Sequence, residues 1–230
     1  MLTPMKIGIL GTGAVGQALA KRLQALGHNV FIGTRNPATT STRNDLDYLG
    51  NPPFKVWHEQ HKAIPLGTYA QAAAHGAMVI NATSGVGSLD ALRAAGEPNL
   101  AGKVLVDVSN PLDFSKGMPP SLSVSNTDSL GEQIQRAFPS VKLVKTLNTM
   151  TIALMVGPES FKGGDHTCFV AGNDAAAKQT ATEMLKSFGW RDIFDLGDVT
   201  SCRGSEAYMM FWFRLYSAGQ TPMFNVKVIR

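Results

Sequence analysis

A doubly wound α/β fold with a mostly parallel sheet is the architecture that this sequence of 230 residues predicts. Three observations predict it. Over residues 1–150, short β-rich runs alternate with alanine-rich helical stretches, as in parallel sheets with crossover helices. The run at residues 77–82 is apolar for most of its length, as in a strand buried on both faces. A glycine-rich turn follows the first apolar run directly.

The individual elements follow this alternation along the chain. Residues 5–10 form the first predicted strand, and residues 15–26 a helix in which Val15, Leu19 and Leu23 recur on one face. Further strands are predicted at residues 29–33, 77–82, 103–108, 142–146, 166–171 and 191–196. Further helices are predicted at residues 175–188 and 202–217, before an extended tail at residues 223–230.

Two parts of unequal size are expected. Residues 1–150 form the Rossmann-type domain, and residues 151–230 a small C-terminal α/β extension, too short for an independent helical domain, that completes the sheet. Residues 36–67 hold four prolines and a stretch rich in Thr, Ser and Asn, which predicts a surface loop with a short helix at residues 54–61. Such a loop is either a lid over a ligand or an insertion with no role, and the sequence leaves both open.

Composition excludes several classes of protein. Hydrophobic residues make up 44% and charged residues 17%, as in a globular chain. The net charge is +4, but the basic residues are scattered, so no nucleic-acid partner is expected. No apolar run reaches the roughly 18 residues of a membrane span, and glycines interrupt the first one, so no signal peptide is expected. The two cysteines lack a CxxC spacing, which favours a cytoplasmic location.

The strongest motif lies directly after the first predicted strand. It is a Gly-x-Gly-x-x-Gly turn made of Gly11, Thr12, Gly13, Ala14, Val15 and Gly16. Because it follows a strand and opens an amphipathic helix, it predicts a Rossmann-type dinucleotide site. The first glycine permits a tight turn, the second lets a pyrophosphate approach the backbone, and the third lets the helix pack on the strand. The helix N-terminus offers N–H groups to the phosphates.

The end of the second predicted strand indicates which dinucleotide binds. NAD-binding domains usually carry an acidic residue there, which accepts a hydrogen bond from the ribose 2′-hydroxyl. This chain has Thr34, Arg35 and Asn36 instead. The guanidinium of Arg35 suits a phosphate, and its neighbours add short hydrogen-bonding groups. The sequence therefore predicts NADP(H) as the cofactor.

Polar residues also follow three later strands, where open α/β sheets place their ligands. They are Ala82, Thr83 and Ser84 after one strand, Ser109, Asn110 and Pro111 after the next, and Asn148 after a third. Because each group follows an apolar strand, all three are expected to face the same crevice as Gly11. We expect them to border a nicotinamide ring and a planar acceptor.

Other catalytic motifs are absent from the sequence. There is no GxSxG elbow, no HExxH motif and no cysteine–histidine spacing for a metal. Surface or capping positions are expected for all five histidines, which are His28, His58, His61, His75 and His166. We therefore assign no catalytic residue and no metal ligand. Hydride transfer suits such a site, since positioning alone can lower its barrier.

Five segments spread over nearly the whole chain resemble a known family. The segments KIGILGTGAVGQALAKRL, GTRNP, VSNPLDF, KTLNTM and FNVKVIR together resemble the coenzyme F420-dependent NADP oxidoreductases. That resemblance implies hydride transfer between NADPH and F420, an 8-hydroxy-5-deazaflavin. It also implies an acceptor pocket formed by residues 147–149 and the C-terminal helix, and a homodimer. The domain is similar, too, to the cytoplasmic reductase part of six-transmembrane metalloreductases, which pass electrons from NADPH through flavin.

Alternative functions remain open at this point. The acceptor is a small molecule, either F420 or a flavin. An enzyme of the 6-phosphogluconate-dehydrogenase or imine-reductase type shares the pattern of the first 150 residues but needs a long helical domain. A redox sensor or interaction protein would bind NADPH without turning it over.

Overall fold

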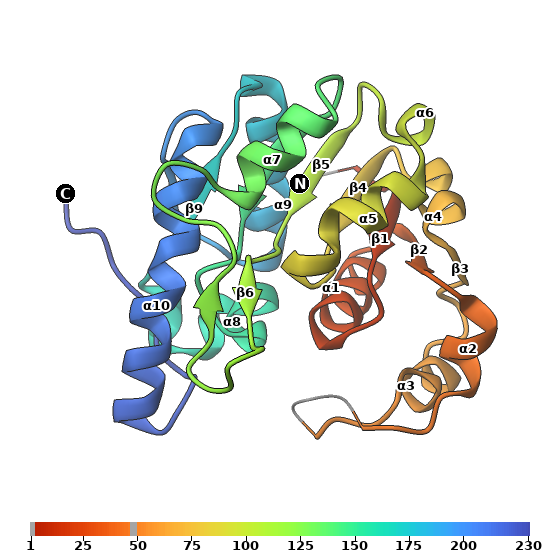
Figure 1. Cartoon of the computed structure of the whole chain (residues 1–230), viewed down its shortest axis with the longest axis horizontal. Coiled ribbons are helices and arrows are strands. Elements are labelled where there is room, and N and C mark those ends of the chain that lie inside the picture. The colour runs from red at the N-terminus through yellow and green to blue at the C-terminus, as the bar shows by residue number, and fades with distance from the viewer. Residues whose placement is uncertain (1–2, 47–49) are drawn as a thin grey trace.

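The computed structural model describes residues 3–46 and 50–230, which form one large sheet flanked by helices (Figure 1). The strands of this sheet are β1 (Lys6–Leu10), β2 (Asn29–Thr34), β3 (Leu66–Thr68), β4 (Met78–Asn81), β5 (Val104–Asp107), β8 (Lys142–Thr146), β9 (Thr167–Ala171) and β10 (Asp192–Asp195). A separate antiparallel hairpin consists of β6 (Leu112–Asp113) and β7 (Ser121–Leu122).

The order of strands across the sheet is β10-β9-β8-β5-β4-β1-β2-β3. All neighbouring strands from β8 to β3 pair in parallel. β9 pairs antiparallel with β8, and β10 runs parallel to β9. The prediction of a doubly wound, mostly parallel sheet is confirmed, and two strands of the C-terminal part continue the same sheet.

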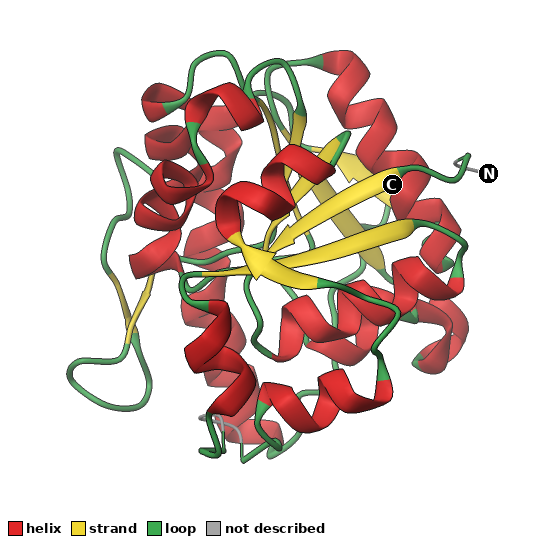
Figure 2. Ribbon diagram, turned by 90° about the vertical axis from the view of Figure 1, so that its right-hand side faces the viewer, coloured by secondary structure: helices red, strands yellow, loops and turns green. Residues whose placement is uncertain are grey.

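Helices cover both faces of the sheet (Figure 2). One face packs against α1 (Ala14–Ala25), α8 (Ile152–Val156) and α9 (Ala175–Phe188) in one apolar cluster. The other packs against α4 (Tyr69–His75), α5 (Gly85–Ala95) and α7 (Leu130–Ala137) in a second cluster. The remaining helices are α2 (Pro37–Thr42), α3 (Phe54–Gln60), α6 (Glu97–Leu100) and α10 (Cys202–Gly219), with short 3₁₀ turns at Pro158–Ser160, Lys162–Gly164 and Val199–Ser201.

Local sequence explains this arrangement. Neighbouring residues of β4 point to opposite faces, so Val79 belongs to one apolar cluster and Ile80 to the other. The side chain of Asp174 caps α9 by accepting a hydrogen bond from the Ala177 amide at 2.8 Å. The same helix ends at Gly189, whose φ of 108° is left-handed.

Residues 36–46 and 50–67 contain more regular structure than expected. They include α2, α3 and the edge strand β3, so the prediction of a loop with one short helix was wrong in part. β3 is formed by pairing with β2, in the register of Ile32 with Leu66. Three residues give too short a pattern to be recognised as a strand in the sequence.

The C-terminal tail lies along the far end of the sheet. The amide of Thr167 donates to the Val226 carbonyl at 2.9 Å. Lys227 pairs with Asp165, and Arg230 with Asp192.

Within the described residues, no helix combines the length and the apolar composition that a membrane crossing requires.

Candidate functional site

The site is built on the carboxyl ends of the parallel strands, which meet along one edge of the sheet. Leu10 at the end of β1 is paired with Gly33 on one side and with Asn81 on the other. Asn81 is paired in turn with Asp107, and Asp107 with Lys145. The turns that follow β1, β2, β4, β5 and β8 therefore leave the sheet side by side, as a ligand site of this fold class requires.

The glycine turn between β1 and α1 meets three different steric demands. Gly11 has a φ of +120°, and a Cβ there would lie 2.4 Å from the Ala82 carbonyl oxygen. A Cβ on Gly16 would lie 2.2 Å from the Gly11 carbonyl oxygen. Gly13 has an ordinary φ of −71°, and a Cβ there would meet nothing within 4 Å. Gly13 thus keeps the space at the start of α1 open, which is the cradle that a pyrophosphate would need.

The residues after β2 differ in what they can offer a ligand. Arg35 is exposed and makes no hydrogen bond or ion pair with any residue that the structure describes. Thr34 is buried, and its hydroxyl lies 2.9 Å from that of Thr40. The side chain of Asn36 caps α2 by accepting from the Thr39 amide at 3.0 Å. Of the three residues expected at the 2′-phosphate, Arg35 therefore has uncommitted donors, and so does Asn36 at Nδ2, because its cap uses only Oδ1.

The residues after β4 hold a fixed pattern of hydrogen bonds. The Thr83 hydroxyl donates to Asn81 Oδ1 at 2.7 Å, and Asn81 Nδ2 donates to Asp107 Oδ1 at 2.9 Å. Thr83 is half-buried, Ala82 is half-buried and Ser84 is exposed. The Ser88 hydroxyl lies 2.9 Å from the Thr83 oxygen. Because the proton of Thr83 is donated to Asn81, one lone pair of its oxygen remains for a ligand even when Ser88 donates to it.

The residues after β5 and β8 bind each other. Asn110 Nδ2 donates to the Asn148 carbonyl at 2.7 Å, and Asn148 Nδ2 donates back to Asn110 Oδ1 at 2.9 Å. Asn148 Nδ2 also donates to the Ser205 carbonyl at 3.1 Å, which ties this turn to α10. Asn148, Ser109 and Pro111 are buried, whereas Asn110 is partly exposed. The loop residue Leu147 has a φ of 60°, a strained value for a branched side chain.

A buried ion cluster lies beneath these turns, and sequence reasoning missed it. Lys145 Nζ lies 2.6 Å from Asp107 Oδ2 and 2.8 Å from Glu206 Oε1 of α10. The Glu206 carboxylate also accepts from the amides of Leu130 and Gly131 at the start of α7. Burial by itself would lower the pKa of Lys145, but Asp107 and Glu206 outweigh it and hold the pKa above its ordinary value. Lys145 therefore stays charged.

The two cysteines have no features of reactive thiols. Both are buried and free. Burial raises the pKa of Cys168 to about 11 and that of Cys202 to about 12. Both thiols are protonated at neutral pH, so neither is a nucleophile.

The expectation of surface or capping positions was wrong for two histidines. His28 is buried and lies 3.3 Å from the Met5 amide through Nδ1. His166 is buried against the edge of Trp190 and contacts the Pro158 carbonyl. Across residues 3–46 and 50–230, no group of three His, Cys, Asp or Glu side chains is placed to hold a metal ion.

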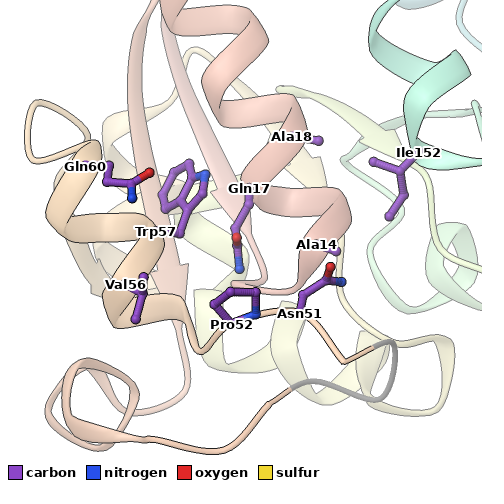
Figure 3. A pocket seen from close by; sticks show the side chains of 9 residues that line it. All are labelled: Ala14, Gln17, Ala18, Asn51, Pro52, Val56, Trp57, Gln60 and Ile152. Carbon is purple, nitrogen blue, oxygen red and sulfur yellow. The ribbon is translucent and has the colours of Figure 1, made fainter.

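A cavity of about 400 Å³ adjoins the glycine turn, within the size range of small-molecule sites. Figure 3 shows Trp57 and Gln60 of α3 on one side of it and Gln17 of α1 on the other. The full lining is Ala14, Gln17, Ala18, Asn51, Pro52, Val56, Trp57, Gln60 and Ile152. The segment at residues 36–67 thus borders the space beside the start of α1.

One face of α10 carries polar atoms without partners. The Tyr208 hydroxyl and Trp212 Nε1 are buried and find no hydrogen-bond partner among the described residues, and neither does Thr149 Oγ1. Residues 205, 208 and 212 recur at helical spacing, so Tyr208 and Trp212 share a face with Ser205, which contacts Asn148. Burial raises the pKa of Tyr208, so its hydroxyl keeps its proton.

The fold and the geometry of this edge define the class of the protein, a Rossmann-type α/β protein of the kind that binds dinucleotides. Comparison with known proteins identifies the family. Residues 6–111 match the family model described as "NADP oxidoreductase coenzyme F420-dependent". A solved structure from Arthrobacter sp. FB24, a candidate F420-dependent NADP reductase, is 54% identical, with 98% of this chain and 100% of that chain covered and a TM-score of 0.94. This chain belongs to the family of coenzyme F420-dependent NADP oxidoreductases.

More distant relatives extend the comparison. Rat metalloreductase STEAP3 is 30% identical over 88% of this chain and 36% of its own length. Human metalloreductase STEAP2 is 26% identical over 91% of this chain and 37% of its own length. The chain therefore spans little more than a third of these relatives. A reductive aminase from Aspergillus terreus in complex with NADPH and ethyl levulinate shares the fold at 16% identity, with a TM-score of 0.62 and 94% and 63% of the two chains covered.

Proposed function

We propose that this chain transfers hydride between NADPH and a planar acceptor, either the deazaflavin F420 or a flavin. The observation that carries the acceptor side is the face of α10 beside Asn148. There, aromatic side chains are combined with buried polar atoms that lack partners among the described residues. Buried polar groups are almost always hydrogen-bonded, so these are the groups that the polar edge of a ring system would satisfy.

The cofactor side is assigned to the turns after β1, β2, β4 and β5. The backbone of Thr12, Gly13, Ala14 and Val15 would hold the pyrophosphate, and Arg35 the 2′-phosphate. The Thr83 oxygen would accept from the cofactor, with Ala82, Ser84 and Asn110 bordering the nicotinamide. Ser109, Pro111 and Asn148 are buried and would support these turns from below.

The residues of this site contribute positioning and exclude competing chemistry. When bound, the reduced nicotinamide supplies the hydride. The buried thiols stay protonated, and Lys145 is held by two carboxylates. The protein therefore holds two rings in contact, and this alone can lower a bimolecular barrier by about 7–11 kcal/mol.

A screen of acceptors tests this proposal. The purified chain is mixed with NADPH and with F420, FMN or FAD, and loss of the reduced-nicotinamide absorbance is followed. Turnover with F420 or a flavin is expected. Tyr208→Phe should raise the KM for the acceptor by about tenfold, the loss of one buried hydrogen bond, and leave the Kd for NADPH unchanged. The control is Tyr216→Phe, which removes a hydroxyl from the exposed part of the same helix and keeps the ring that stacks on Trp212.

Two other results would overturn the proposal. Binding of NADPH without oxidation by any acceptor would indicate a sensor or interaction protein. Oxidation that requires an imine would indicate the imine-reductase alternative.

A second candidate activity is reduction of Fe(III) chelates through flavin, which the metalloreductase relatives favour. It predicts chelate reduction that depends on added flavin.

The setting of the enzyme is also part of the proposal. Two free buried thiols support a cytoplasmic location. The exposed Phe211 on α10 supports a homodimer, which light scattering coupled to gel filtration would test. No nucleic-acid partner is proposed, since the basic residues form no cluster in the sequence.

A further inference from the structure

Tyr69 is brought beside Arg35 by a strand pairing that the sequence does not reveal. β2 and β3 run in parallel with Thr34 opposite Thr68. Arg35 directly follows β2 and Tyr69 directly follows β3, so both lie at the carboxyl edge of the sheet. The backbones are in close contact, since a Cβ on Gly33 would lie 3.0 Å from the Tyr69 Cα.

Neither side chain makes a hydrogen bond to a residue within 3–46 or 50–230. The guanidinium of Arg35 is exposed and unpaired within the described chain. Tyr69 is half-buried against the apolar cluster that contains α4, α5 and α7. Its hydroxyl makes no hydrogen bond to a described residue. Burial raises the pKa of Tyr69, against a smaller opposite effect of the nearby Arg35, so the hydroxyl is a donor at neutral pH.

The two neighbours of Arg35 in the sequence are engaged in structural hydrogen bonds. Thr34 bonds to Thr40, and Asn36 caps α2 through Oδ1, which leaves its Nδ2 donors available. A phosphate monoester beside Arg35 has three oxygens and needs further donors. Besides Asn36 Nδ2, an adjacent free donor is the phenol of Tyr69, which comes from a separate element of the fold.

We propose that Tyr69 is a specificity-determining residue for NADP(H), whose hydroxyl donates a hydrogen bond to the 2′-phosphate that Arg35 neutralises. This inference rests on the NADP(H) site and not on the identity of the acceptor. It extends the recognition of the phosphate from one cationic side chain to a pair that bridges β2 and α4.

Calorimetry with four ligands tests the pair. Wild type and Tyr69→Phe are titrated with NADPH, NADH, adenosine 2′,5′-bisphosphate and 5′-AMP. The variant should bind NADPH and the bisphosphate about tenfold more weakly, the lower range for a hydrogen bond to a charged group. NADH and 5′-AMP should be unaffected. Tyr216→Phe is the matched control and should change none of the four.

Each other outcome overturns the inference. Equal weakening for all four ligands would mean that the Tyr69 ring packs on adenine. No weakening would mean that the hydroxyl does not reach the phosphate. Phenylalanine keeps the ring in its apolar contact, so the thermal midpoint should be unchanged. Failure of F420 or flavin turnover would leave these titrations intact, so the two proposals can fail separately.

Discussion

The centre and the rim of one sheet edge use charged residues in opposite ways. At the centre, the Lys145 ammonium contacts Asp107 and Glu206, and each carboxylate receives further hydrogen bonds. At the rim, the Arg35 guanidinium contacts no described partner. Both groups lie at the end of a parallel strand. A charged residue at this edge therefore indicates a ligand site when its hydrogen-bond donors have no partner among the described residues.

The largest expected effect is on the centre. Lys145→Met leaves two carboxylates buried without their cation, and removal of one partner of a buried pair costs about 3–5 kcal/mol. The free energy of unfolding, measured by urea denaturation, should fall by that amount. The surface control is Lys178→Met, which removes a pair with the exposed Asp195 and should cost less than about 1 kcal/mol. Equal losses of unfolding free energy in the two variants would show that the buried cluster stabilises the protein no more than the surface pair does.

Substitution of two glycines of the turn should change different properties, stability in one case and cofactor affinity in the other. Gly16→Ala places a methyl group against the Gly11 carbonyl, so stability should fall by about 2–3 kcal/mol, in the range of overpacking. Gly13→Ala has room for its methyl group, so the thermal midpoint should be unchanged, but NADPH and NADH should both bind at least about tenfold more weakly. Retention of full affinity in Gly13→Ala would move the pyrophosphate away from this turn.

At the rim, Arg35→Ala should act on one cofactor alone. The variant should lose about 1–3 kcal/mol of NADPH binding energy, the value of a charge-assisted hydrogen bond. NADH binding should hardly change, because that cofactor carries no 2′-phosphate. The control is Arg93→Ala, which removes an exposed arginine paired with Asp90 on α5. An equal loss for both cofactors would contradict the role of Arg35.

The smallest effect is expected at the surface ion pair of Asp128 and Arg136. A hydrogen bond from Arg136 holds the pKa of Asp128 at about 2, below its ordinary 3.8. A depressed carboxyl pKa contributes stability above the unfolded value, and this is lost as pH falls through the folded value. Asp128→Asn should therefore be slightly less stable at neutral pH, and the difference should vanish near pH 2. A difference that persists there would point to packing instead of charge.

The sequence predicts what depends on local spacing. The glycine turn, the position of Arg35 and the limits of β8 and α9 could all be predicted, because each depends on neighbouring residues. The ion cluster could not, since Lys145 and Glu206 meet only after α10 docks on the sheet. A weak signal was present, because a charged residue ends the apolar run of β5 and another lies within that of β8. The division at residue 150 stays a prediction.

Tyr69 shows the same limit. It lies in a different element from Arg35, and the strand that joins them has three residues. No hydrophobic alternation is visible over so short a run, so the pairing depends on tertiary structure. The expected partners of Arg35 were its sequence neighbours, whereas the fold uses the Thr34 hydroxyl and the Asn36 side-chain carbonyl oxygen in structural hydrogen bonds.

The docking of α10 has a mechanical consequence. Its first turns are fixed by buried contacts of Cys202, Ser205 and Glu206, while most residues of its second half are exposed. A helix of 18 residues is about 27 Å long. At this length, a tilt of roughly 5° at its buried start would move its C-terminal end by roughly 2 Å. Substitutions around Cys202, Ser205 and Glu206 would thus shift side chains near the other end of the helix without contacting them.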